Sequence, residues 1–109
     1  MTKLNVSDYF KREAKPLVKK HRSLAKEIQE LFDSLKIDSI QGYTLPHTCF
    51  KVRLAIESKG KGKRSGARVI THFHVINDEI FMLGIYDKSD QGTISEKELT
   101  KRLKALDLI

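Results

Sequence analysis

FKVRLAIESKGKGKRSGARVITHFHVINDEIFMLGIYDKS, residues 50–89, holds three strand-like runs and a loop rich in lysine, arginine and glycine. Side chains on a strand alternate between the two faces of a sheet. In the runs at 50–57 and 67–75, apolar side chains alternate with polar ones, so each run has one apolar face. The run at 80–85 is almost entirely apolar, which is typical of a strand buried on both faces. These three strands predict the centre of a sheet.

The polar faces of the first two runs are strongly basic. If the runs pair with their apolar faces together, the other face collects Lys51, Arg53, Arg68, His72 and His74. A cationic surface suits a phosphate backbone, and histidine can transfer protons near neutral pH. We therefore expect this face to contact a nucleic acid. The two histidines fit an acid–base role and a solvent-facing role equally well.

Two amphipathic helices are expected before the sheet. Apolar residues at helical spacing predict the first over 6–21, with a kink or break at Pro16. The second is expected over 23–35, with Ser23 as its N-cap and a clear apolar stripe that faces the core. A turn-rich segment, 38–48, follows it.

The end of the chain predicts a hairpin and one more helix. The pair Asn77-Asp78 favours a tight hairpin turn between the second and third strands. Ser95 and Glu98 form a capping box that begins a helix reaching about Leu106. We expect an α+β fold in one domain, 1–109: two N-terminal helices on a small twisted, mainly antiparallel sheet, with a C-terminal helix.

Composition narrows the class of protein. The 109 residues are 39% hydrophobic and 32% charged, which is typical of a globular chain, and the formal net charge is +7. This charge favours an anionic partner such as nucleic acid, ribosome, acidic protein or anionic membrane surface. The single cysteine, Cys49, excludes an intrachain disulfide and is expected in the core. Since no apolar run has the length of a membrane span or a leader, we expect a cytoplasmic protein.

Two further motifs have features of ligand sites. Residues 87–98, DKSDQGTISEKE, fit part of a calcium-binding EF-hand loop, although a strand precedes them and Gln91 stands at the fifth position. A turn at Gly92 followed by the capped helix explains the same residues, so calcium binding stays an alternative. The loop KGKGKRSG can contact phosphate through Lys61, Lys63 and Arg64, or can simply be a flexible connection.

Three of these segments together resemble a known family. CFKVRL at 49–54, SGARVITHFHV at 65–75 and the apolar strand ending in IYDKS at 85–89 look like the RelE/ParE superfamily of bacterial toxins. The resemblance covers the whole order of elements and implies the RelE-like microbial RNase fold. It is similar to the members that carry a long Gly/Lys loop between the first two of these segments.

The resemblance implies a ribosome-dependent mRNA endoribonuclease that inhibits translation without metal or cofactor. The ribose 2′-hydroxyl attacks the adjacent phosphate. Lys51 and Arg53 match the two strand lysines, one the general base and the other a charge stabiliser; Arg68 matches the phosphate-holding arginine. Lys88 falls where an arginine acts as general acid. Ile94 falls near the family's base-orienting tyrosine, for which Tyr86, His72 or His74 would have to compensate.

The resemblance also implies partners. Such a toxin is held by a small antitoxin with an acidic segment, which covers the basic site and carries the element that binds operator DNA. The expected partners are therefore the cognate antitoxin and mRNA on the ribosome. Operator DNA is reached only through the antitoxin, and no membrane is involved. The alternative is a binding module without enzyme activity, either a gyrase poison or a degenerate toxin.

Overall fold

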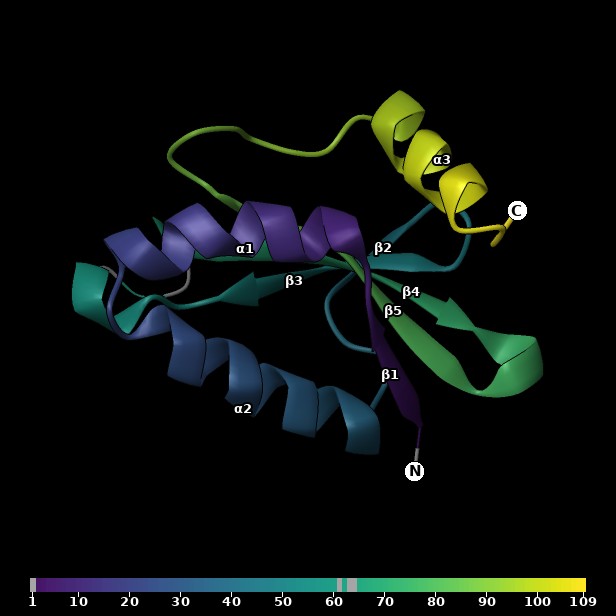
Figure 1. The fold of residues 1–109 in the computed structure, drawn as a ribbon, viewed down its shortest axis with the longest axis horizontal. Coiled ribbons are helices and arrows are strands. Elements are labelled where there is room, and N and C mark those ends of the chain that lie inside the picture. The colour runs from purple at the N-terminus through teal and green to yellow at the C-terminus, as the bar shows by residue number, and fades with distance from the viewer. Residues whose placement is uncertain (1, 61, 63–64) are drawn as a thin grey trace.

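The computed structural model describes residues 2–60, 62 and 65–109 (Figure 1). Its strands and helices follow one another in this order: β1 Lys3–Val6, α1 Asp8–Lys20, α2 Leu24–Ile37, β2 Tyr43–Leu45, β3 Cys49–Leu54, β4 Ala67–His74, β5 Glu79–Asp87 and α3 Glu96–Ala105. The fold is α+β, as predicted.

The five strands form one sheet in the order β1-β5-β4-β3-β2. β1 runs parallel to β5 and the other neighbouring pairs are antiparallel, so the expectation of a mainly antiparallel sheet is confirmed. β5 lies between β1 and β4, and most of its side chains are buried, as the apolar run at 80–85 predicts. The short strands β1 and β2 were not predicted.

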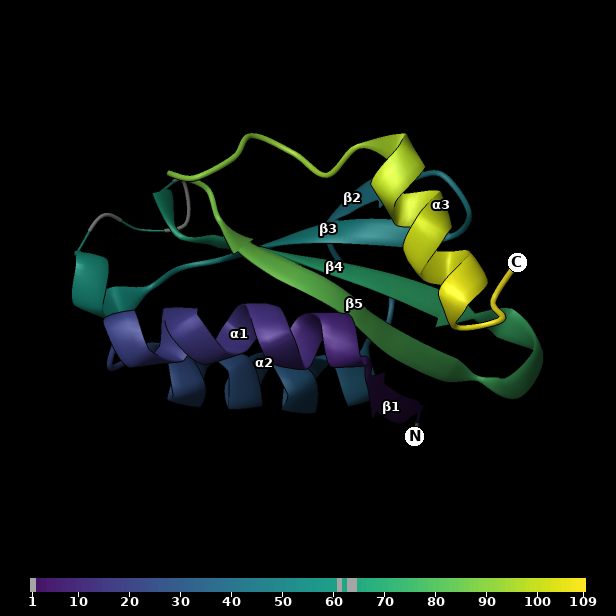
Figure 2. The same cartoon turned by 45° about the horizontal axis from the view of Figure 1, so that its top comes forward.

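Helices α1 and α2 cover one face of the sheet, and α3 covers part of the other (Figure 2). The first core joins the two N-terminal helices to the apolar faces of the strands; among its fully buried members are Leu24, Leu35, Val69, Ile80 and Met82. The second core lies beneath α3 and contains Cys49, Ile70, Leu83, Leu99 and Leu103.

The second core corrects the expectation of a wholly cationic face. Leu99 and Leu103 of α3 pack on Ile70 and Leu83, so one part of that face is apolar and closed. Ile70 and Cys49 share the alternation of the basic residues, and a register shift between Ile70 and Thr71 changes the pairing with β5 at this point. The basic surface is therefore restricted to the part of the sheet that α3 leaves open.

The helix ends follow the predicted capping only in part. α1 begins at Asp8, because Val6 pairs with Met82 in the sheet and Ser7 caps the helix by accepting the Phe10 N–H. Pro16 lies inside α1 without dividing it. At α3 the Ser95 hydroxyl accepts the Glu98 N–H, but the Glu98 carboxylate binds Arg102 instead of closing the capping box.

Of the two predicted turn segments, one is a hairpin turn of a different type and the other contains a strand. The hairpin between β4 and β5 exists, but it uses the 3-10 turn Val75–Asn77 and then Asp78 with a φ of 51°. The segment 38–48 contains β2, which pairs with β3. Gly42 precedes β2 with a φ of +92°, and a Cβ there would lie 2.3 Å from the Lys51 carbonyl oxygen, so only glycine fits. Within the described part of the chain, no helix has the length and apolarity to cross a membrane.

Candidate functional site

Three basic side chains share the face of the sheet opposite α1 and α2. In the β3–β4 pair Arg53 lies directly across from Arg68, and Lys51 lies across from Ile70. Because side chains of paired residues point the same way, these three form one group, which we call the cationic strip (Lys51, Arg53 and Arg68). The prediction that these three side chains share one face of the sheet is confirmed.

Arg68 is the most enclosed member of the cationic strip. It is 2% exposed, and one of its guanidinium nitrogens donates to the Ala67 carbonyl oxygen at 3.2 Å. Burial lowers the pKa of Arg68, and the neighbouring charge of Arg53 lowers it further. Both causes disfavour the charged form, so an anion beside Arg68 would have a favourable electrostatic effect.

Tyr43 is a member of this surface that the sequence did not reveal. It lies on β2 directly across from Lys51, and the Arg53 guanidinium carbon lies 5.0 Å from the centre of its ring. The ring is nevertheless 52% exposed. An exposed aromatic ring beside cations can stack on a nucleobase. The only signal in the sequence was a tyrosine after Gly42 in a segment expected to be a turn.

Lys88 and Tyr86 lie at the end of β5 that is nearest to Arg68. Tyr86 pairs with Arg68 across the sheet, is buried, and donates a long hydrogen bond of 3.5 Å to the Gly92 carbonyl oxygen. Burial raises the pKa of Tyr86. Lys88 is exposed, and its backbone N–H donates to the Gly66 carbonyl oxygen at 3.0 Å. The predicted phosphate contacts Lys61, Lys63 and Arg64 lie outside the described residues.

The strand histidines lie away from Arg68 along β4, and His72 is two residues beyond Ile70, the partner of Lys51. His72 is four residues beyond Arg68, which is roughly 13 Å along a strand, and it is 5% exposed. Its Nδ1 donates to the His47 carbonyl oxygen at 2.9 Å, and burial lowers its pKa, so the ring is neutral near pH 7. His74 lies further along β4 and is half-buried against Phe81.

Cys49 lies beside His72 and behaves as a core residue. The thiol is fully buried, 3.6 Å from His72 Nδ1. Burial raises its pKa to about 12, so a thiolate is not formed near neutral pH. The expectation of a core role is confirmed. Among residues 2–60, 62 and 65–109, no three His, Cys, Asp or Glu side chains come together as a metal site.

A cavity of about 450 Å³ lies between α3, β5 and the loop before α3. Tyr86 and Ile70 form its sheet side, Gln91, Thr93 and Ile94 come from the loop, and Glu98 and Arg102 come from the helix. Tyr86 therefore separates this cavity from Arg68, its neighbour on β4. The cavity mixes apolar and hydrogen-bonding groups, as small-molecule sites do.

The segment that resembles a calcium loop is organised differently. Asp87 is the last residue of β5, and a lysine ammonium, Lys59 Nζ, lies 2.9 Å from its carboxylate. Burial alone would raise the pKa of Asp87, but hydrogen bonds from Lys59 and Ser89 outweigh it and lower the value to about 2. The first calcium ligand of the motif is thus already bound to an internal cation.

Comparison with known proteins identifies the fold. The chain matches no protein-family model, and no characterised protein sequence matches it. A solved structure of a mutant of the E. coli toxin RelE in the free state matches 96% of this chain and 97% of its own, with a TM-score of 0.58 and 12% identity. The isolated E. coli RelE toxin matches 97% and 99%, with a TM-score of 0.50 and 18% identity. The chain therefore has the RelE-like toxin fold.

Proposed function

We propose that this protein is the toxin of a type II toxin–antitoxin pair and that it cleaves mRNA on the ribosome. The observation that carries the proposal is the cationic strip, in which Arg53 and Arg68 face one another with Lys51 beside them. The fold shared with RelE supports it. A ring of fixed cations stabilises the extra negative charge that a phosphate acquires when a hydroxyl attacks it.

In the proposed reaction the ribose 2′-hydroxyl attacks the neighbouring phosphate, and the 5′-oxygen leaves. Lys51 takes the hydroxyl proton, because an arginine does not deprotonate in proteins and so cannot serve as the base. Arg53, which is exposed, holds the phosphate oxygens, Arg68, which is 2% exposed, stabilises their charge from the sheet beneath, and Lys88 gives a proton to the leaving oxygen. As a lysine, Lys88 makes a point contact in place of the two parallel hydrogen bonds of an arginine.

Tyr43 takes the base-stacking role in this proposal. The fold leaves Tyr86 buried, and Ile94 has no ring, whereas Tyr43 is half-exposed next to Lys51 and Arg53. Stacking on an aromatic ring contributes about 1–3 kcal/mol per base and accepts any base. The ring would therefore orient a nucleotide without choosing the codon.

The partner that the surface fits best is an antitoxin with an acidic amphipathic helix. An apolar groove of about 470 Å³ lies between α1 and α2; Phe10, Ala14, Val18, Ile28 and Phe32 are among its lining residues. Lys11, Lys15 and Lys19 follow it at a spacing of four residues along α1, so they form one cationic edge. An apolar helix face with acidic flanks complements both features.

The partner proposal is tested by rescue from growth arrest. The antitoxin candidate is a short neighbouring reading frame, co-expressed with the toxin. Val18→Asp combined with Lys15→Glu should abolish the rescue while the toxin stays active, and Lys97→Glu on α3 should not. Rescue of the double variant at wild-type level would contradict the groove assignment.

The nuclease proposal is tested by mapping mRNA 5′ ends after brief induction. Wild type should produce new ends at codon positions in translated messages. Lys51→Ala and Arg53→Ala, which alter accessible side chains, should lower their yield at least about 100-fold. Arg68→Ala should do the same if its circular dichroism matches wild type, and the exposed Lys97→Ala is the control. Growth arrest without new ends would favour the alternative of a non-enzymatic binding module, such as a gyrase poison.

A further inference from the structure

The Lys59 ammonium group forms all of its hydrogen bonds within the protein. Its ammonium group donates to three oxygens: the Ser65 carbonyl at 2.8 Å, Asp87 Oδ1 at 2.9 Å and the Ser89 hydroxyl at 3.2 Å. An ammonium has three N–H donors, so all of them are used inside the protein. Its side chain is only 15% exposed. Lys59 is thus unavailable to a phosphate, although it begins a loop that is rich in lysine and glycine.

Asp87 is the centre of this group of contacts. Its side chain is 3% exposed, and besides Lys59 it accepts the Ser89 backbone N–H at 2.9 Å. Its second oxygen lies 3.4 Å from His21 Nε2, at the end of α1. Removing one member of a buried, hydrogen-bonded ion pair strongly destabilises the fold, because the other charge is left without a partner. We call Lys59, Ser65, Asp87 and Ser89 the clasp.

The clasp lies where two parts of the proposed site meet, the start of β4 and the end of β5. Lys59 and Ser65 flank residues 60–64, and Ser65 is three residues before Arg68. Asp87 pairs with Ala67 and is followed at once by Lys88, whose N–H donates to Gly66. The clasp therefore fixes the start of β4 against the end of β5, and with them the backbones that carry Arg68 and Lys88.

We propose that the clasp is a positioning device for the phosphate site. It holds Lys88 and Arg68 at a fixed separation, so that the charges of both act on one phosphate. Lys59 and Asp87 are positioning residues: they act through Arg68 and Lys88 and contact no RNA themselves. This inference rests on the proposed function, because it assumes that the anion at this site is an RNA phosphate.

Asp87→Asn is the decisive variant, because the net charge and the clasp predict opposite changes in RNA affinity. Removing an acidic group from a basic surface should tighten RNA binding if only net charge matters. If the clasp positions the cations, Asp87→Asn should weaken binding about tenfold and lower the salt slope of binding by about one phosphate contact. Lys59→Met should behave in the same way.

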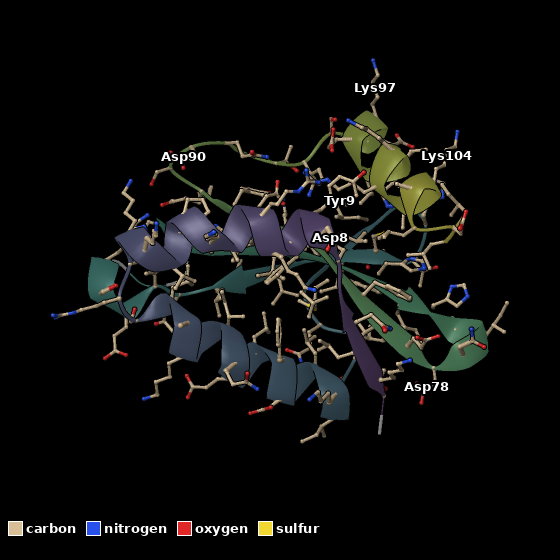
Figure 3. The ribbon with its side chains drawn as sticks, in the orientation of Figure 1. Asp8, Tyr9, Asp78, Asp90, Lys97 and Lys104 are labelled. Carbon is tan, nitrogen blue, oxygen red and sulfur yellow. The ribbon has the colours of Figure 1, made fainter. Side chains whose placement is uncertain are left out.

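The probe is a short RNA analogue with a 2′-deoxy ribose at the cleavage site, whose binding is measured at several salt concentrations. The matched control is Asp90→Asn, three residues after Asp87 on the exposed loop before α3, which should bind equally or more tightly (Figure 3). Amide hydrogen exchange of Lys88 provides a second readout that needs no RNA. Breaking the clasp should speed the exchange of Lys88 about tenfold more than it speeds the exchange of amides in α2, which report the global loss of stability.

The outcomes separate this inference from the proposed function. Unchanged Lys88 exchange in both clasp variants would overturn the inference, and so would tighter RNA binding by Asp87→Asn. An equal rise in exchange at Lys88 and throughout α2 would also overturn it, because the role would then be general stability. New mRNA 5′ ends in cells that express wild type are mapped in parallel. If wild type binds the analogue but produces no new ends, the nuclease proposal falls and the clasp is still judged by exchange and binding.

Discussion

Replacing Arg102 by methionine removes the centre of the contacts that hold α3 on the sheet. Its guanidinium makes two parallel hydrogen bonds of 2.8 Å with the Glu13 carboxylate of α1. It also donates to the Leu83 carbonyl oxygen and to Glu98, both at 2.9 Å. The Tyr9 ring lies 4.8 Å from its central carbon, between α1 and α3 in Figure 3. Burial alone would lower the pKa of Arg102, but the hydrogen bonds and charges of Glu13 and Glu98 outweigh it and raise the pKa.

The free energy of unfolding should fall by about 2 kcal/mol in Arg102→Met, less than the roughly 3–5 kcal/mol for a fully buried pair. The loss is smaller than for a fully buried pair because the Glu13 side chain is 35% exposed and can be rehydrated when Arg102 is removed. In a domain of this size the melting temperature should drop by roughly 8–15 °C. Gly84→Ala should act in the same direction, because a Cβ there would lie 2.3 Å from an Arg102 nitrogen and 2.7 Å from a Glu13 oxygen.

Urea denaturation of Arg102→Met, Glu13→Gln and the double variant measures the loss and the coupling between the two residues. The coupling should be about 1 kcal/mol or more, since the two side chains are in contact. Lys101→Met, which removes an exposed cation from the same helix, is the matched control and should stay within about 0.5 kcal/mol of wild type. Equal losses in Arg102→Met and Lys101→Met, or additive effects of Arg102 and Glu13, would refute the reasoning.

Three other predictions follow from single side chains. The lowering of the Asp87 pKa from 3.8 to about 2 corresponds to about 2 kcal/mol of folding stability, which is present above pH 4 and lost as pH falls toward 2. Measuring the free energy of unfolding between pH 7 and pH 2 checks this prediction, because Asp87→Asn should lack the loss. Tyr43→Ala should weaken RNA binding about tenfold whereas Tyr43→Phe should not, and equal affinities would exclude stacking. The Cys49 thiol should react with a thiol reagent only at the rate of unfolding, so rapid labelling of the folded protein would contradict its burial.

The sequence predicted the cationic strip because strand alternation is a local property. Lys51 and Arg53 are separated by one residue, and Arg68 begins a run whose apolar positions fix its face. Once the apolar faces pair, the basic residues must share the other face, as the Arg53–Arg68 register shows. The fold class and the two N-terminal helices followed from equally local patterns.

The features that the sequence missed depend on contacts between distant segments. β1 and β2 have four and three residues, too few for a pattern, and they are strands only because β5 and β3 offer free edges. Tyr43 joined the site for the same reason. The cover of α3 over Ile70 was also missed, because the apolar positions Leu99 and Leu103 show that the helix packs but not on which face.

The same limit explains the placement of the histidines. His72 and His74 share the alternation of Arg68, so the sequence grouped them with the cationic strip. Alternation fixes the face but not the distance along it. In the structure His72 is buried at the far end of β4, where the His47 carbonyl oxygen holds its ring. Distance along the strand therefore separates His72 from Arg68, and burial keeps its ring off the exposed surface.

The burial of Arg68 links the stability of the protein to its proposed function. Desolvation and the charge of Arg53 both lower the pKa of Arg68, which means that the charged form is disfavoured in the free protein. A phosphate at this position offsets both effects, because opposite charges attract more strongly where water is excluded. Anion binding should therefore stabilise the fold in proportion to the logarithm of the anion concentration. The burial of Arg68 beside Arg53 thus disfavours its charge in the free protein, and the phosphate of the proposed reaction compensates for it, as expected where a site is optimised for its ligand rather than for folding.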